Sequence, residues 1–477
     1  MTAADRPTRV SAVVDDALGG DDLVGLLDRL ARREVSADEL RAAAVTRARS
    51  VNPHLNAVAA WVEQSTLPAA AADAPLAGIP TLVKDNEDLV GLPTTHGSLA
   101  VADRAAVSSS PWVAQFLGLG VVPVAKSTLS EFGLTATTET LRFGATRNPW
   151  NTNHSSGGSS GGSAALVAAG VVPIAHANDG GGSIRIPASC CGLVGLKPSR
   201  GRLDDVPVRV PVDITTQGVL TRSVRDTVRY YSEVERIRHV PGLPPIGLVE
   251  GPSPVRLRIG LVVTAPLGLP VSEEVVQAVL ATGAVCERLG HRVEVLPNLA
   301  DESFAADFLR YWALLSSLIC RLGFLEFGRG FDASRTEPFT RELAAVASQQ
   351  ATLVPGSLRR LRRLARTHED GFTDYDIVLS PVLAHAPPVI GHLGPELDAR
   401  THLVRVLRYA AFTPLQNVSG SPALSLPLGR SATGVPVGVQ VAAPFGHERR
   451  LLQLALELEE AAPWPTLTST GGDAARQ

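Results

Sequence analysis

Two glycine-rich segments bracket one short helix-and-strand pattern near the middle of the chain, and this arrangement limits the fold more than any other feature. Residues 157–163 read Gly-Gly-Ser-Ser-Gly-Gly-Ser, and residues 178–185 read Asn-Asp-Gly-Gly-Gly-Ser-Ile-Arg. Between them lie a helix-like run, Gly162–Ala169, and a strand-like run, Val171–Ala177. A helix followed by a returning strand can bring both glycine loops to the same edge of a sheet.

The same alternation continues along the rest of the chain. Apolar runs that predict strands lie at Ile79–Val83, Val121–Ala125, Arg256–Val263, Tyr375–Pro381, Ala423–Leu428 and Val437–Ala442. Helical patterns separate them. The sequence therefore predicts an α/β fold, with one large α/β/α domain built on a mixed central sheet.

The N-terminal region has a different character. Residues 22–49 predict two helices, and Ser36 with Glu39 forms a capping box that starts the second one. We expect an N-terminal helical arm over residues 1–65 and an enzyme domain over 66–464. A helical elaboration is expected at about 302–370, and a loose tail at 465–477.

Charge and hydropathy narrow the choice of partners. The net charge is −3, so no global basic field favours nucleic acid or an anionic membrane. The basic run Arg359–Arg366 is more typical of a solvated helix face. No stretch reaches 18 uninterrupted apolar residues, and residues 1–9 lack the pattern of a signal peptide. We expect a cytoplasmic protein with no nucleic-acid or membrane partner, and the sequence leaves open a homodimer.

Lysine is unusually rare. The chain has 41 arginines but three lysines, which are Lys84, Lys126 and Lys197. Arginine cannot lose its proton in a protein, whereas a buried lysine can. The three positions are therefore candidate bases, although for Lys126 and Lys197 an ordinary structural role is favoured.

Amide hydrolysis needs an activated nucleophile, a proton donor for the leaving amine and donors for the oxyanion. Gly180, Gly181 and Gly182 can turn several backbone N–H groups toward one point before Ser183. Lys84 follows the strand-like run Ile79–Val83, and partial burial there lowers a lysine pKa toward neutrality. A neutral lysine could then take a proton from Ser183 through the hydroxyl of Ser159. A glycine loop, a serine or a lysine alone is usually structural, so it is their conjunction that indicates catalysis.

The joint pattern resembles the amidase signature family, over nearly the whole of residues 22–463. The resemblance implies an amidase fold and a triad of the nucleophile Ser183, the bridging Ser159 after a cis peptide bond, and Lys84. It further implies that residues 180–183 supply the oxyanion donors. Ser160, Asp179 and Arg185 match the family's supporting positions. No cofactor is implied.

Within that family, the motifs are most similar to those of bacterial hydrolases of 6-aminohexanoate cyclic dimer. The shared segments are Gly-Ala-Thr-Arg-Asn-Pro-Trp-Asn at 144–151, the Asn-Asp pair at 178–179, and the stretches 412–427 and 436–440. Family members accept very different amides, so the resemblance leaves the physiological substrate open.

Three other functions are compatible with parts of this pattern. An α/β-hydrolase would need a strand directly before the Gly-x-Ser-x-Gly at 157–161, but residues 147–156 are polar and rich in turn formers. A glutamine-hydrolysing subunit of a tRNA amidotransferase usually has an acidic residue where this chain has Ala410. A non-catalytic scaffold on the same fold would not need all three triad residue types.

The sequence also indicates which residues could line the substrate pocket. An apolar stripe with helical spacing could wall an acyl pocket or simply pack in the core, and it consists of Phe304, Phe308, Leu309, Trp312 and Leu315. Together, Ala410 and this stripe, which includes Trp312, predict a small amide substrate that is uncharged or cyclic. No metal is predicted, because the 11 histidines show no paired ligand spacing near the glycine loops.

Overall fold

A computed structural model describes residues 8–63, 73–203, 210–297, 302–367 and 372–467. Its largest sheet has eight strands in the order β12-β11-β13-β15-β14-β9-β10-β8. The two pairs formed by β11 are parallel and the remaining neighbours are antiparallel, so the expected mixed central sheet is confirmed. The strands are β8 (Ile174–Asp179), β9 (Val194–Lys197), β10 (Thr216–Thr221), β11 (Arg258–Leu261), β12 (Arg292–Val295), β13 (Ile377–Pro381), β14 (Ala423–Arg430) and β15 (Pro436–Ala442).

A smaller sheet has three strands in the order β1-β3-β2. They are β1 (Val58–Trp61), β2 (Pro80–Lys84) and β3 (Val122–Ser127). Two short strand pairs belong to neither sheet: β4 (Glu139–Thr140) pairs with β5 (Gly144–Ala145), and β6 (Arg147–Asn148) pairs with β7 (Asn151–Ser155).

The two sheets meet where β2 lies beside β8. The Thr81 hydroxyl donates to the Ile174 carbonyl at 2.9 Å, and the backbone N–H of Lys84 donates to Nδ1 of His176 at 3.2 Å. We call this junction the seam. Each of these two bonds involves a side chain, so β2 and β8 lie side by side but do not form a backbone ladder, and the two sheets remain separate.

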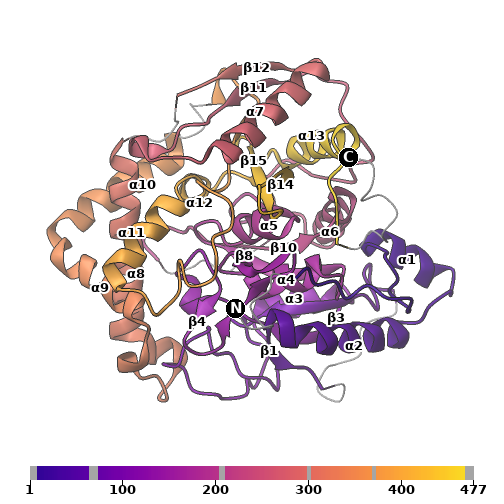
Figure 1. Cartoon of the computed structure of the whole chain (residues 1–477), viewed down its shortest axis with the longest axis horizontal. Helices are drawn as coiled ribbons and strands as arrows, with labels where there is room; N and C mark the ends of the chain where they lie inside the picture. The colour runs from indigo at the N-terminus through magenta and orange to yellow at the C-terminus, as the bar shows by residue number, and fades with distance from the viewer. Residues whose placement is uncertain (1–7, 64–72, 204–209, 298–301, 368–371, 468–477) are drawn as a thin grey trace.

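Helices surround the sheets. They are α1 (Leu23–Ala31), α2 (Ala37–Leu55), α3 (Pro111–Gly118), α4 (Gly161–Ala168), α5 (Arg185–Cys191), α6 (Val224–Ile237), α7 (Glu273–Arg288), α8 (Glu302–Phe327), α9 (Pro338–Gln349), α10 (Val354–Thr367), α11 (Ala399–Tyr409), α12 (Pro414–Ser419) and α13 (Glu448–Ala461). Figure 1 shows α8 to α10 gathered on one side of the molecule and α1 and α2 on the opposite side.

Helix capping follows the sequence signals closely. Ser36 and Glu39 form the expected capping box at the start of α2. Ser223 accepts from the backbone N–H of Asp226 at the start of α6. The Asp226 carboxylate in turn accepts from the N–H groups of Leu23 and Val24, the first two residues of α1. The N-terminal arm is therefore tied to the main sheet's own helix layer.

The expected strand Val171–Ala177 is shifted along the chain. β8 begins at Ile174 because Pro173 has no N–H to donate to a ladder, and it runs on to Asp179. The shift places Asn178 and Asp179 at the strand end that faces the second glycine loop. β10 was not predicted from the sequence, and it pairs with β8 along its full length.

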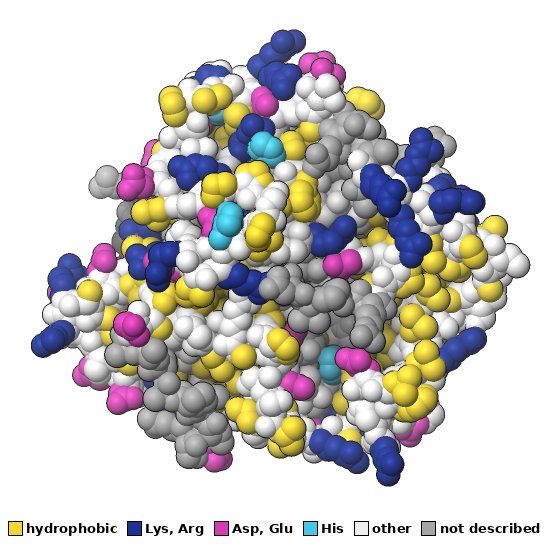
Figure 2. All heavy atoms as spheres, turned by 180° about the vertical axis from the view of Figure 1, so that it is seen from behind, with side chains coloured by type: hydrophobic (Ala, Val, Ile, Leu, Met, Phe, Trp, Pro, Cys, Tyr) yellow, Lys and Arg dark blue, Asp and Glu magenta, His cyan; other side chains and the backbone are white. Residues whose placement is uncertain are grey.

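Arginines of α10 lie on the solvent side of that helix, as a solvated face would require. Leu358, Leu361 and Leu364 pack inward against an apolar cluster that includes Phe304 and Phe308 of α8. In Figure 2, which is turned by 180° from Figure 1, the main group of basic side chains lies at the upper right, the side of the molecule that holds α10 on the left of Figure 1. Acidic and apolar side chains are interspersed elsewhere on that face, which agrees with the small net charge.

One described helix, Ser303–Phe327 within α8, is long and apolar enough to cross a membrane by length and composition, with a mean hydropathy of 1.3. The absence of an 18-residue apolar run did not exclude such a helix, because polar residues interrupt this one. Its inner face packs on α9 and α10, as a core helix would. Only 28% of its most apolar 18-residue stretch is buried, however, which is less than a core helix usually shows.

The division into arm, domain and tail stays a prediction. The expected boundary at residues 65 and 66 lies outside the described residues, and so does most of the expected tail.

Candidate active site

Lys84 is the last residue of β2, at the strand end that the sequence predicts. Its side chain is fully buried. Nζ donates to the Ser159 hydroxyl at 2.7 Å and to Oδ1 of Asn178 at 2.6 Å. Burial lowers the pKa of Lys84 to about 7, against the opposing charges of Asp179 and Glu87. A lysine in this state exchanges its proton near neutral pH.

The first glycine loop packs tightly around Ser159. The peptide bond between Gly158 and Ser159 is cis. A Cβ on Gly158 would lie 2.7 Å from the backbone of Thr137, and one on Gly162 would lie 2.5 Å from the backbone of Thr128. Glycine is required at both positions because any side chain would displace a neighbouring strand or loop. Ser160 makes a long contact of 3.5 Å with the Asn178 carbonyl.

Asp179 and Arg185 form a buried ion pair behind the second loop. The Arg185 guanidinium contacts both Asp179 oxygens, at 2.9 and 3.0 Å. It also donates to the side chains of Asn417, at 2.6 Å, and Gln440, at 2.7 Å. Although burial acts to raise it, the pKa of Asp179 lies well below its usual range because Arg185 and Asn417 stabilise the carboxylate. The loop is thus held from both of its ends.

The four expected oxyanion donors do not behave alike. The N–H of Gly182 donates to Oδ1 of Asp179 at 2.7 Å, so in this structure Gly182 supports the loop. Among the hydrogen bonds of the described residues, the N–H groups of Gly180, Gly181 and Ser183 have no partner. Gly182 has a φ of +131°, and a Cβ there would lie 2.4 Å from the Thr413 hydroxyl. Three N–H groups therefore remain for an anionic oxygen.

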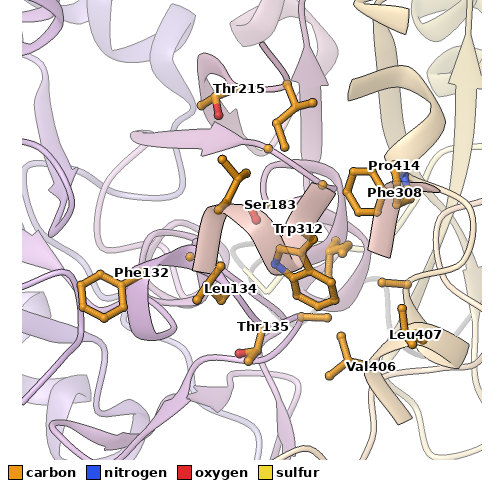
Figure 3. A pocket seen from close by; sticks show the side chains of 18 residues that line it. Phe132, Leu134, Thr135, Ser183, Thr215, Phe308, Trp312, Val406, Leu407 and Pro414 are labelled. Carbon is orange, nitrogen blue, oxygen red and sulfur yellow. The ribbon is translucent and has the colours of Figure 1, made fainter. Parts of the chain in front are cut away.

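Ser183 opens into a cavity of about 190 Å³. Figure 3 shows its hydroxyl near the side chain of Trp312, which lies on α8 with Phe308. The cavity is mostly apolar, and its larger apolar lining residues are Phe132, Leu134, Ile186, Ile214, Phe308, Trp312, Leu315, Val406, Leu407 and Pro414. No charged side chain is among the described residues that line it. The structure gives no hydrogen bond between the described side chains of Ser183 and Ser159.

The predicted apolar stripe divides between pocket and core. Phe308, Trp312 and Leu315 line the cavity, and Ala410 forms part of the opposite wall. Phe304 instead packs in the cluster shared with α10, and Leu309 packs against the main core. Both interpretations of the stripe hold, because a helix turns successive side chains to different surroundings.

The other two lysines have structural surroundings. Lys126 forms an ion pair with Asp85 at 2.8 Å and also donates to the Pro93 carbonyl. Lys197 is fully buried and donates to the Pro198 carbonyl at 2.8 Å. Burial, and then the charge of Arg185, lowers the pKa of Lys197 to about 7. A lowered pKa therefore does not by itself identify a base in this chain.

Sequence reasoning missed several residues of the site. Asn178 contacts the amine of Lys84, and Thr413 donates to the Gly181 carbonyl at 2.6 Å. Asn417 donates to both the carbonyl and the carboxylate of Asp179. The position of Asn178 at a strand end beside the glycine loop was an available signal, whereas the signal for Thr413 and Asn417 was their place in the shared stretch 412–427.

No group of three or more His, Cys, Asp or Glu side chains within the described ranges is arranged to hold a metal ion. Cys190, Cys191, Cys286 and Cys320 are free thiols, and burial raises the pKa of Cys190 to about 12.

The chain resembles known proteins over most of its length. The family model "Amidase" matches residues 39–452. The chain is 48% identical to "Putative amidase AmiC" of Mycobacterium leprae (strain TN), over 96% of this chain and 98% of that protein. It is 36% identical to "6-aminohexanoate-cyclic-dimer hydrolase" of Pseudomonas sp. (strain NK87), over 90% and 92% of the two chains. The solved structure of 6-aminohexanoate cyclic dimer hydrolase complexed with substrate superposes with a TM-score of 0.84 and 32% identity, covering 94% and 98%.

Proposed function

Because the chain belongs to the amidase signature family and is an enzyme of carbon–nitrogen bond hydrolysis, we propose that it cleaves small, uncharged amides through Ser183, Ser159 and Lys84. The observation that carries this proposal is the 2.7 Å hydrogen bond from the Lys84 amine to the Ser159 hydroxyl, beside a cavity that Ser183 lines. A lysine with a pKa of about 7 is half neutral at pH 7, so it can accept a proton through Ser159.

The reaction proceeds in two halves. Ser183 Oγ attacks the amide carbon as its proton passes to Ser159, whose own proton passes to Lys84. The resulting oxyanion accepts hydrogen bonds from the N–H groups of Gly180, Gly181 and Ser183. Collapse breaks the C–N bond as the proton returns through Ser159 to the leaving amine, which leaves an acyl-enzyme. Water then attacks the acyl carbon by the same proton route and releases the carboxylic acid.

The acyl-enzyme gives the direct test of the nucleophile. We expect a fluorophosphonate to label Ser183, and peptide mass spectrometry of the labelled protein to locate the adduct there. The labelling rate should fall as the pH drops below about 7, because protonated Lys84 cannot act as a base. An adduct on Ser159 with Ser183 unmodified would overturn the assignment.

The cavity's lining favours neutral, apolar acyl groups. A charged group placed there would lose its hydration without gaining an ionic partner among the described lining residues. Glutamine carries an ammonium and a carboxylate, and Ala410 offers neither a charge nor a hydrogen bond to them. A glutamine-hydrolysing subunit would need such a group in its pocket.

A hydrolysis panel tests this specificity. On glutamine, short aliphatic amides, aryl amides and cyclic or linear aminohexanoate oligomers, we expect neutral amides to exceed glutamine in kcat/KM by roughly 100-fold or more. Trp312→Ala should shift the optimum to longer acyl chains, because the indole forms part of the cavity wall and contacts Phe308 and Phe339.

Trp464→Ala is the matched control, since Trp464 lies outside the cavity wall. It removes the same side chain and should leave the chain-length preference unchanged. A marked preference of the unmodified enzyme for glutamine would contradict the proposal and support an amidotransferase role. A cytoplasmic location and action without nucleic acid or membrane remain part of the proposal.

A further inference from the structure

A line of buried polar side chains leads away from the backbone of Lys84 across the seam. The Lys84 N–H donates to Nδ1 of His176 at 3.2 Å, so the proton of this imidazole must be on Nε2. Nε2 lies 2.9 Å from Oε1 of Gln217. Burial lowers the pKa of His176 to about 3, which keeps the ring neutral and preserves this tautomer.

The line ends at a carboxylate. Nε2 of Gln217 donates to Oε1 of Glu87 at 2.7 Å, and the Ser110 hydroxyl donates to Oε2 of Glu87 at 2.5 Å. Each group from Lys84 to Glu87 donates to the next, and both Glu87 side-chain oxygens act as acceptors. Burial raises the pKa of Glu87, while its hydrogen bonds from Ser110 and Gln217 and the charge of Lys84 act to lower it. When Glu87 is ionised, hydrogen bonds that all point toward its charge polarise one another.

Packing keeps this line out of bulk solvent. Trp112 covers the His176 ring with their centroids 4.0 Å apart. Trp112 lies on α3, and Ser110 is the residue that caps the start of that helix. Lys84, His176 and Gln217 are all buried. The same helix start thus supplies both the Trp112 ring over His176 and the Ser110 hydrogen bond to Glu87.

We propose that Glu87, Gln217 and His176 form a relay that positions Lys84 and sets the charge it carries when the substrate arrives. This inference rests on the proposed role of Lys84 as the base. The three relay residues are positioning residues, since none of them lines the cavity.

Of the described charged groups near Lys84, Glu87 is the one whose charge is not already balanced by an ion pair. Asp179, on β8, faces Lys84 but is already paired with Arg185. Lys126, on β3, is paired with Asp85. His96 and His176 are buried and neutral, because burial lowers the pKa of each to about 3.

Glu87 has no cation bonded to it among the described contacts, and its charge acts to raise the pKa of Lys84. Removing that charge should therefore lower the pKa of the amine and keep it neutral in more acidic solution.

The test is Glu87→Gln, which keeps a similar shape and removes the charge. The readout is the rate of fluorophosphonate inactivation from pH 5 to 9, which needs no substrate. We expect the ratio of the rate at pH 6 to that at pH 8 to rise about three- to fivefold, as the acid limb moves to lower pH. Asp103→Asn is the control, because it removes an exposed carboxylate that is paired with Arg142 and not with the relay, and its ratio should equal that of the unmodified enzyme.

Gln217→Leu provides a second test of the relay. This variant keeps the charge of Glu87 but removes the hydrogen bonds that link His176 to Glu87, so we expect about a tenfold lower inactivation rate at the optimum pH. Thermal unfolding checks that each variant is folded. The relay is overturned if Glu87→Gln leaves the pH profile in place, or, should that variant not fold, if Gln217→Leu reacts as the unmodified enzyme does. Failure of the proposed function looks different, because the unmodified enzyme itself would then show no labelling of Ser183.

Discussion

Ser183→Ala is expected to lower kcat for the best amide by roughly 10⁴-fold or more. The substitution removes the one oxygen that would form the acyl-enzyme, and the remaining loop offers no other hydroxyl at that point of the cavity wall. Binding should persist, since the apolar lining and the free N–H groups of Gly180 and Gly181 are untouched. Steady-state hydrolysis combined with calorimetric binding of the same amide separates the two effects.

Ser232→Ala is a suitable companion, because this serine of α6 bonds to a local carbonyl and lies outside the cavity wall. It should keep full activity. A Ser183→Ala enzyme with activity within tenfold of the unmodified protein would rule out Ser183 as the nucleophile and would turn attention to Ser159.

Lys84→Arg should lower kcat by roughly 10²- to 10⁴-fold. Arginine keeps the positive charge but stays protonated, so it cannot accept the proton that Ser159 passes on. Its larger head group would also have to fit where Nζ now lies 2.7 Å from Ser159 and 2.6 Å from Asn178. The kcat of the purified variant at pH 8 provides the measurement.

Lys84→Met separates chemistry from folding. The folded state lowers the pKa of Lys84 from 10.5 to about 7, so between these values the unfolded chain binds the extra proton. The unmodified protein is therefore destabilised relative to Lys84→Met as the pH falls from about 10 toward 7, and the Tm difference should grow in favour of the methionine variant. A pH-independent difference would mean that Lys84 is charged in the folded protein.

Lys197→Met is the matched control for activity, since Lys197 is equally buried and has a similarly lowered pKa. It should retain most of the hydrolysis rate. Equal losses at both positions would show that a buried lysine is needed for the fold and not for proton transfer.

Local sequence patterns were sufficient where neighbours in the chain set the structure. Glycine loops, the capping box at Ser36 and the lysine at the end of β2 depend on residues within a few positions, and all were predicted. The mixed sheet followed from the alternation of apolar runs with helical patterns.

Features that depend on distant residues were not predictable in the same way. The N–H of Gly182 donates to Asp179, and this bond depends on the conformation of the turn, which the glycine pattern alone does not specify. β8 runs to Asp179, so Asn178 lies within the strand, and its contact with Lys84 depends on how β2 packs beside β8. The stripe on α8 splits between pocket and core because α10 covers one part of it, and nothing in the stripe itself records that neighbour.

Arg185 depends on residues that the ribosome adds much later. Its guanidinium is completed by Asn417 and Gln440, which follow it by 232 and 255 positions. Synthesis runs from the N-terminus, so a growing chain contains Lys84 and both serines long before the last hydrogen-bond acceptors of Arg185 are added. A chain truncated before residue 440 would carry every reactive group of the proposed triad without the complete support of the second glycine loop, and we expect it to be inactive.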